Sequence, residues 1–134
     1  MSDDRGPVYA NRPWPERYTF VPAMRVGRMV WISGTTATDD DGRIVAPGDI
    51  AGQTRQIFRK FEKLLQSLGG SCDDIVETTD YYITTDNYKA TADVRREFFR
   101  QARPASTGVQ VAGLLRDGAL IEIKAVAVLK AEPV

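Results

Sequence analysis

Hydrophobic residues recur with a helical period in the first half of the chain. They are Ile57, Phe61, Leu64, Leu65 and Leu68, which are separated by steps of four, three, one and three positions. Such spacing places all of them on one face of an α-helix. The pattern predicts a helix over residues 50–68, and the two glycines that follow it are typical of a helix end.

β-branched and aromatic residues gather in shorter runs elsewhere, which is typical of strands. We expect strands over residues 18–26, 29–34, 75–83, 107–112 and 120–130. The first two are separated by a stretch of hairpin-loop length at positions 27 and 28. A second helix is expected to begin with Asp86 as its N-cap residue and to end near Gln101, ahead of Pro104.

Both faces of the last expected strand are largely apolar. One face carries Ile121, Ile123, Ala125, Ala127 and Leu129, which suits packing beneath helices. The other carries Leu120, Glu122, Lys124, Val126 and Val128. The element order predicts an α+β domain with both helices on one face of a mixed sheet, so the second apolar face needs another cover. Association of identical copies is the simplest way to cover it.

The chain fits a single domain, because 134 residues can bury a sufficient core without a disulfide. We divide it into an extended, proline-rich arm over residues 1–17 and one domain over residues 18–134. Such an arm often packs on a neighbouring subunit. The arm lacks the apolar segment of a signal peptide and no stretch has the length of a membrane span, so we expect a cytoplasmic protein without a membrane partner.

Composition narrows the chemistry. Lysine plus arginine equals aspartate plus glutamate at 18 each, so the overall charge makes a nucleic-acid partner unlikely. The chain has no histidine, which excludes serine and cysteine nucleophile systems that use imidazole, and the usual histidine-containing zinc sites. The single cysteine, Cys72, is interpreted as a small residue in a turn, and the acidic residues beside it are expected to raise its thiol pKa. Catalysis would then depend on carboxylates, hydroxyls, arginine or backbone groups.

Six stretches stand in order over about residues 18–129: RVGRMVWISGTTA, QTRQIFRKFEKLL, SLGGSCDDIVETTDYYIT, REFF, PASTGVQVAGL and LIEIKAVAV. In their order and spacing they resemble the Rid family of reactive intermediate deaminases, also called YjgF-like or L-PSP endoribonuclease-like proteins. The resemblance implies a chorismate-mutase-like homotrimer with a central barrel and a small-molecule cleft between neighbouring subunits. It also implies hydrolysis of enamines or imines such as 2-aminoacrylate, with no metal and no organic cofactor.

The resemblance assigns roles to particular residues of the chain. Glu122 matches the glutamate that orients the attacking water, and it is the one catalytic candidate. The ligand-binding candidates are Phe20, Ser33, Gly34, Thr35, Ser106, Thr107 and Gly108. Ser106 stands where the family has an arginine that clamps the substrate carboxylate, so weak or no activity on 2-aminoacrylate is expected. Arg103, or Arg25 or Arg28 from a neighbouring subunit, could replace that arginine, or each could be a solvated surface charge.

Three functional hypotheses follow from the residues and the resemblance together. The first is a cofactor-free enzyme that acts on an imine, an enamine or a related reactive metabolite other than 2-aminoacrylate. The second is a non-catalytic trimer that binds a metabolite, and the third is a ribonuclease or translation inhibitor. The hydroxyls near the strand ends could line a cleft opposite Glu122 or only satisfy backbone groups, and Glu122 itself could pair with Lys124.

Overall fold

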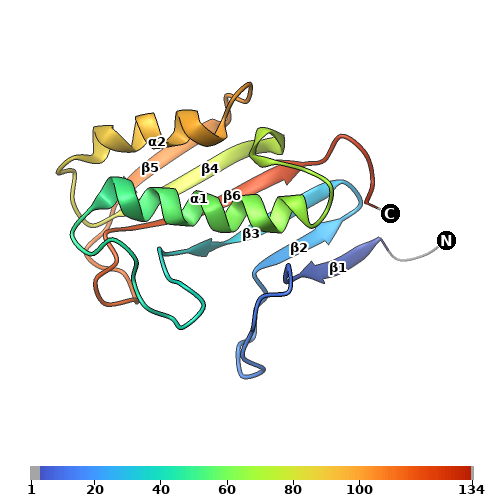
Figure 1. The fold of residues 1–134 in the computed structure, drawn as a ribbon, viewed down its shortest axis with the longest axis horizontal. Coiled ribbons are helices and arrows are strands. Elements are labelled where there is room, and N and C mark those ends of the chain that lie inside the picture. The colour runs from blue at the N-terminus through green and yellow to red at the C-terminus, as the bar shows by residue number, and fades with distance from the viewer. Residues whose placement is uncertain (1–3, 134) are drawn as a thin grey trace.

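The computed structural model describes residues 4–133, in which two α-helices lie on one side of a six-stranded sheet (Figure 1). The strands are β1 (Arg5–Val8), β2 (Ala23–Val26), β3 (Met29–Thr35), β4 (Ile75–Tyr82), β5 (Ala105–Gln110) and β6 (Ile121–Val128). The helices are α1 (Ile50–Gln66) and α2 (Thr91–Phe98), with short 3-10 helices η1 (Cys72–Asp74) and η2 (Tyr88–Ala90). The α+β class predicted from the sequence is confirmed.

The sheet is mixed, with the strand order β1-β2-β3-β6-β4-β5. Only β4 and β5 pair in parallel, and every other pair of neighbours is antiparallel. Because β3 and β4 are both antiparallel to β6, they run in the same direction. Parallel strands require a crossover connection, and α1 and α2 supply these crossovers after β3 and β4, on the same face of the sheet.

The core lies between α1 and the central strands. Asp49 caps α1 by accepting a hydrogen bond from Gly52 N, and the helix buries Ile57, Phe58 and Phe61 completely. The helix-facing residues of β6 are buried as predicted: Ile121, Ile123, Ala125 and Ala127 are each at most 2% exposed. The spacing of apolar residues therefore identified both sides of this interface.

The other face of the sheet is not covered by any described part of the chain. Its apolar members are Met29, Trp31, Val109, Val126 and Val128, which we call the open face. Trp31 is paired with Val126 and Met29 with Val128, so these side chains form a continuous surface across β3 and β6. Trp31 is 43% exposed and Met29 39%.

The N-terminal segment differs from the expected arm. Residues 1–3 lie outside the described residues, but Arg5–Val8 form β1, which pairs with β2 of the same chain. Pro7 is tolerated there because β1 is an edge strand and need not donate a hydrogen bond on its outer side. The expected strand over residues 18–26 is also wrong in its first half, since only Ala23–Val26 belong to the sheet.

The second helix is shorter than expected and does not use Asp86 as its cap. Asn87 has a left-handed backbone conformation, which interrupts the chain before α2, and no side chain caps the helix start. The helix ends at Phe98 rather than near Gln101. Strand β5 begins two residues earlier than expected, so all three candidate residues at positions 106–108 lie within it.

Cys72 is buried in η1, not placed in an open turn. Burial raises its thiol pKa to about 12, and the carboxylates of Glu62, Asp73 and Asp74 add to the shift. The expected direction is confirmed, although burial is the largest cause. A thiol protonated at neutral pH is a poor nucleophile.

Candidate functional site

A groove of about 940 Å³ opens where β3 ends and β6 begins. It is lined by Glu122 together with residues from three segments, 12–20, 34–42 and 115–117. We call it the Glu122 groove. It brings together four of the candidates from the sequence, namely Phe20, Gly34, Thr35 and Glu122.

A β-bulge shapes the floor of the groove. Ile32 pairs with Ala125 and Thr35 with Ile123, so Ser33 and Gly34 together face a single residue of β6. A Cβ atom at position 34 would lie 2.7 Å from Glu122 Oε2, so the carboxylate rests directly against the α-carbon of this glycine. A side chain at position 34 would therefore collide with the Glu122 carboxylate, and glycine leaves room for it.

The Glu122 carboxylate is half-buried and has no partner among the described residues. It forms no hydrogen bond or ion pair with any of residues 4–133, including Lys124. Burial raises the pKa of this carboxyl group above its ordinary value. A carboxylate with a raised pKa is a stronger base than an ordinary one, which suits it to accept a proton from water or from a ligand.

An aromatic cluster forms one wall of the groove. Trp14 meets both Tyr18 and Phe20 edge-on, with ring centroids 5.3 and 5.4 Å apart, and Tyr18 stacks on Phe20. Trp14 Nε1 donates a hydrogen bond to the Phe20 carbonyl at 2.7 Å, which fixes the ring. The wall can pack against a flat ligand.

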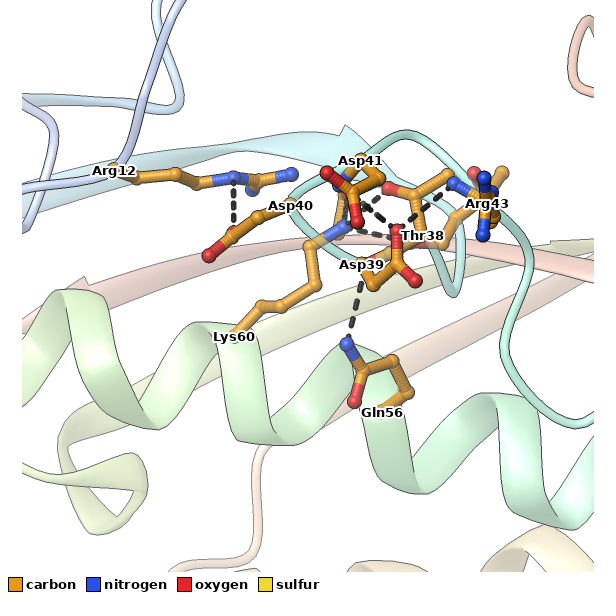
Figure 2. Close-up of polar contacts among 10 residues, drawn as sticks. Arg12, Thr38, Asp39, Asp40, Asp41, Arg43, Gln56 and Lys60 are labelled. Carbon is orange, nitrogen blue, oxygen red and sulfur yellow. Dashed lines mark hydrogen bonds and ion pairs between the residues drawn. The ribbon is translucent and has the colours of Figure 1, made fainter.

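Lys60 of α1 supports the segment that leaves β3. Its Nζ donates to Thr35 Oγ1 at 2.6 Å, to the Thr36 carbonyl at 2.8 Å and to Thr38 Oγ1 at 3.0 Å. Figure 2 shows Lys60 reaching from α1 to this segment, beside the acidic turn that contains Asp39 and Asp40. Burial lowers the pKa of the Lys60 ammonium group to about 7. The Thr35 hydroxyl is thus engaged within the protein.

Ser33 has a structural role in this chain. Its Oγ donates to the Val21 carbonyl at 2.7 Å and its backbone N donates to the Pro22 carbonyl at 2.9 Å. These bonds hold residues 21 and 22 against β3 where no regular ladder exists. The backbone at the candidate residues Ser33 and Gly34 is therefore fixed by the segment that precedes β2.

The structure places Ser106, Thr107 and Gly108 away from the groove. They belong to β5, an edge strand that β4 separates from β6. Ser106 lines a different pocket of about 410 Å³, together with Arg95, Arg96 and Arg103. A single chain therefore does not bring these three candidates to Glu122.

Within a single chain, the arginines considered as replacements do not reach the Glu122 groove either. Arg25 donates to the Gly27 carbonyl and Arg28 to the Lys130 carbonyl, both near the β2–β3 turn. Arg103 donates to the neighbouring Ala102 carbonyl and lies in the Ser106 pocket. The guanidinium groups that do line the Glu122 groove belong to Arg12, Arg17 and Arg116.

Apart from Phe20, sequence reasoning missed the N-terminal contribution to the groove. Residues 12–20 were divided between an extended arm and a strand, although they form the aromatic wall. The available signal was the interleaving of arginine with tryptophan, tyrosine and proline in RPWPERYTF. Lys60 could not be identified in this way, because only the fold brings it beside Thr35.

Two features are absent from the part of the chain that the structure describes. No group of three or more histidine, cysteine, aspartate or glutamate side chains is arranged to hold a metal ion. None of the helices in residues 4–133 combines the length and the apolar character needed to cross a membrane.

The family model described as endoribonuclease L-PSP matches residues 10–129, which include the whole groove. This chain belongs to the Rid family. A Rid relative from Acinetobacter baylyi, named 3-aminoacrylate deaminase RutC, is 35% identical over 113 residues, covering 84% of this chain and 89% of the relative.

Solved structures agree with the Rid assignment. A Yersinia pestis protein of the conserved Rid family has a TM-score of 0.82 at 27% identity, covering 93% of this chain and 99% of that chain. A YjgF family member from Mycobacterium tuberculosis has a TM-score of 0.77 at 30% identity, with coverage of 93% and 99%. The chain thus matches these proteins over nearly their full length.

Proposed function

We propose that the protein is a cofactor-free deaminase that hydrolyses the carbon–nitrogen bond of a small enamine or imine in the Glu122 groove. The observation that carries the proposal is the Glu122 carboxylate, which is half-buried, has no partner in residues 4–133 and lies beside a groove large enough for a small metabolite. The name of the 35% identical relative supports this reaction class, because 3-aminoacrylate is an enamine acid.

The proposed reaction needs only water and a proton carrier. An enamine first gains a proton on carbon and becomes an iminium ion. Water then adds to the iminium carbon, and Glu122 accepts one of its protons as the carbon–oxygen bond forms. Glu122 returns that proton to nitrogen, and the carbon–nitrogen bond breaks as the carbonyl forms. The departing ammonia takes the proton of the new hydroxyl group, so the products are ammonium and a carbonyl compound. A raised carboxyl pKa suits both proton transfers.

We propose that the substrate is not 2-aminoacrylate. Ser106 offers a neutral hydroxyl where the family resemblance implies an arginine, and one hydroxyl cannot replace a charged bidentate donor. Activity on 2-aminoacrylate is therefore expected to be weak.

We also propose that the chain assembles as a homotrimer with a central barrel. The open face, with Trp31 and Met29 exposed, supports self-association because it is apolar and uncovered by described residues. In such an assembly β5 of one copy could lie beside the Glu122 groove of the next. Ser106, Thr107 and Gly108 would then complete the ligand cleft from the neighbouring subunit.

The deciding experiment measures ammonia release with a coupled assay and compares the wild type with Glu122→Gln. A small series of enamine acids generated in the assay, including 3-aminoacrylate, serves as substrates. Glutamine keeps the shape but cannot accept the proton, so turnover is expected to fall by about 10² to 10⁴. The molecular mass and the melting temperature should stay unchanged.

Two other outcomes would replace the proposal. If the wild type binds a metabolite but releases no ammonia from any of the series, the protein is a non-catalytic binding protein. If purified protein cleaves RNA and Glu122→Gln abolishes that cleavage, the endoribonuclease description of the family model applies to this chain.

A further inference from the structure

The lining of the Glu122 groove also contains a cationic group. Arg12 lines the groove and its side chain is 23% exposed, so it is held within the wall. Two consecutive left-handed residues, Ala10 and Asn11, turn the chain at this point, and Arg12 N donates to the Tyr9 carbonyl at 3.0 Å. The base of the side chain is therefore fixed by the fold.

The guanidinium fork of Arg12 is largely unused by the protein. Its closest acidic contact joins Nε to Asp40 Oδ1 at 3.8 Å, as Figure 2 shows, and Asp40 is 76% exposed. A long contact to a solvated carboxylate contributes little. The terminal nitrogens of Arg12 donate no hydrogen bond within residues 4–133, so a planar, charged pair of donors remains free.

The other arginines of the groove are less suited to bind an anion. Arg116 donates to the Gly42 carbonyl, and Arg17 is exposed with its guanidinium over the Tyr18 ring. Arg12 also lies near Trp14, 5.8 Å from the ring centroid, so a flat ligand bound at its fork would lie against the aromatic wall.

Two acidic residues of the groove, Asp39 and Glu122, do not neutralise the charge of Arg12, because neither forms an ion pair with it. Asp39 Oδ1 is engaged by the backbone N atoms of Asp41 and Arg43. Glu122 forms no ion pair within residues 4–133. The groove thus presents a cation at Arg12 and a carboxylate at Glu122 that are not paired with each other.

We infer that Arg12 binds the carboxylate of a flat iminium or enamine acid whose nitrogen end reaches Glu122. The ligand class is a small conjugated acid in which the carboxylate is separated from the reacting carbon. This inference rests on the proposed function for the role of Glu122, but the binding step at Arg12 can be measured without any turnover.

Crotonate is a suitable probe, because it has the shape of 3-aminoacrylate with a methyl group in place of the amine and cannot react. Crotonamide is the matched neutral ligand. Binding is followed by the ¹H–¹⁵N signal of the Trp14 indole, which Trp31→Phe assigns because the chain has only two tryptophans. Crotonate is expected to move this signal in a saturable way, and crotonamide is not.

Variants test the role of the guanidinium. Arg12→Met should weaken crotonate binding by about tenfold or more, as expected for loss of a charged hydrogen-bonding partner. Arg12→Lys should lose less, since it keeps the charge without the fork. Asp40→Asn should strengthen binding, because the competing carboxylate is removed, and a folding defect would not produce such a gain. Arg59→Met, which removes an exposed arginine of α1 outside the groove lining, is the control and should bind as the wild type does.

The inference fails if Arg12→Met binds crotonate within about twofold of the wild type, if crotonamide binds equally well, or if Arg103→Met abolishes binding instead. Its failure is distinct from that of the proposed function. Arg12-dependent crotonate binding in a protein that releases no ammonia would leave the inference standing and refute the deaminase. Glu122-dependent turnover with unchanged crotonate binding in Arg12→Met would do the reverse.

Discussion

The ammonium group of Lys60 is buried among oxygen atoms that carry no full charge. Its three partners are two hydroxyls and a backbone carbonyl, all in the segment 35–38. Burial is the largest cause of its lowered pKa, with Arg12 and Arg116 adding repulsion and Asp39 and Asp40 opposing it. Protonation of the Lys60 amine therefore affects the hydrogen bonds that hold residues 35–38, the segment that leads from Gly34 into the groove wall.

The lowered pKa of the Lys60 amine should make the free energy of unfolding depend on pH. Its pKa is about 7 in the folded chain and close to 10.5 in the unfolded chain, so between these values the unfolded state binds more protons. The free energy of unfolding should then rise with pH across this window, by at most about 1.4 kcal/mol per pH unit for one proton. Below pH 7 both states are protonated to the same extent, so the pH dependence vanishes while the cost of burying the ammonium group is fully present.

Urea denaturation at several pH values between 7 and 10 tests this expectation. The difference in unfolding free energy between the wild type and Lys60→Met should increase with pH, and titration of other groups cancels in that difference. Lys63→Met, which removes an exposed lysine from the same helix, is the control and should show a constant difference. A flat difference for Lys60→Met would contradict the lowered pKa.

At the scale of elements, α2 is attached to the sheet by one buried ion pair. Asp80 of β4 is fully buried, and its Oδ2 accepts from Arg95 Nη2 and from the Tyr88 hydroxyl, each at 2.5 Å. The other oxygen, Oδ1, has no partner in the described chain. Burial and the Asp80 carboxylate raise the pKa of the Tyr88 hydroxyl, so it stays a donor. The pair thus holds η2 and α2 on β4.

Removing the arginine should destabilise the protein strongly. Arg95→Leu leaves the Asp80 carboxylate buried without its cation, which typically costs about 3–5 kcal/mol. Adding Asp80→Asn in the same chain should recover part of that loss, because the uncompensated charge is gone. Arg96→Leu is the control: its partner Asp93 is exposed, so the change should stay within about 0.5 kcal/mol in urea denaturation. Equal effects of the two single variants would refute the role of Asp80.

The elements that could be predicted from sequence are those whose faces are set by burial. Helix α1 and strand β6 were located to within two residues because each must place apolar side chains on the core at its own period. Strand β1 escaped notice because four residues with a glycine and a proline carry no such period. Residues 18–22 are rich in strand-forming types, but their rings pack on Trp14 instead of pairing in the sheet.

The candidate site could be predicted only in part, for a related reason. Glu122 and Gly34 lie in segments with recognisable motifs, whereas Arg12, Trp14 and Lys60 reach the groove only through the turn at residues 10–11 and the crossing of α1. Sequence spacing alone does not encode those distances. In a single chain Ser106 lies away from the Glu122 groove because β4 lies between β5 and β6 in the sheet. The strand order sets this separation, and local sequence patterns do not reveal it.

At the scale of the whole molecule, the open face is a large apolar surface that no described part of the chain covers. Trp31 and Met29 are exposed on the open face next to Val126 and Val128, in the middle of the sheet. Exposed apolar surfaces of this kind are usually interfaces, and closed symmetric assemblies are the common way to bury them. The proposed homotrimer predicts that a charge placed in this surface will prevent assembly without unfolding the subunit, because the core lies on the other side of the sheet.

Trp31→Glu makes this prediction measurable by analytical ultracentrifugation at micromolar concentration. The wild type should sediment at about three times the 14.9 kDa chain mass, and the variant as a monomer. Gln66→Glu, which adds the same charge at the exposed end of α1, should remain trimeric. A monomeric or dimeric wild type would refute the trimer. If Ser106 and Glu122 act in one cleft, the monomeric variant should also lose ammonia release while its far-UV circular dichroism stays native, because each groove would then lack the β5 edge of its neighbour.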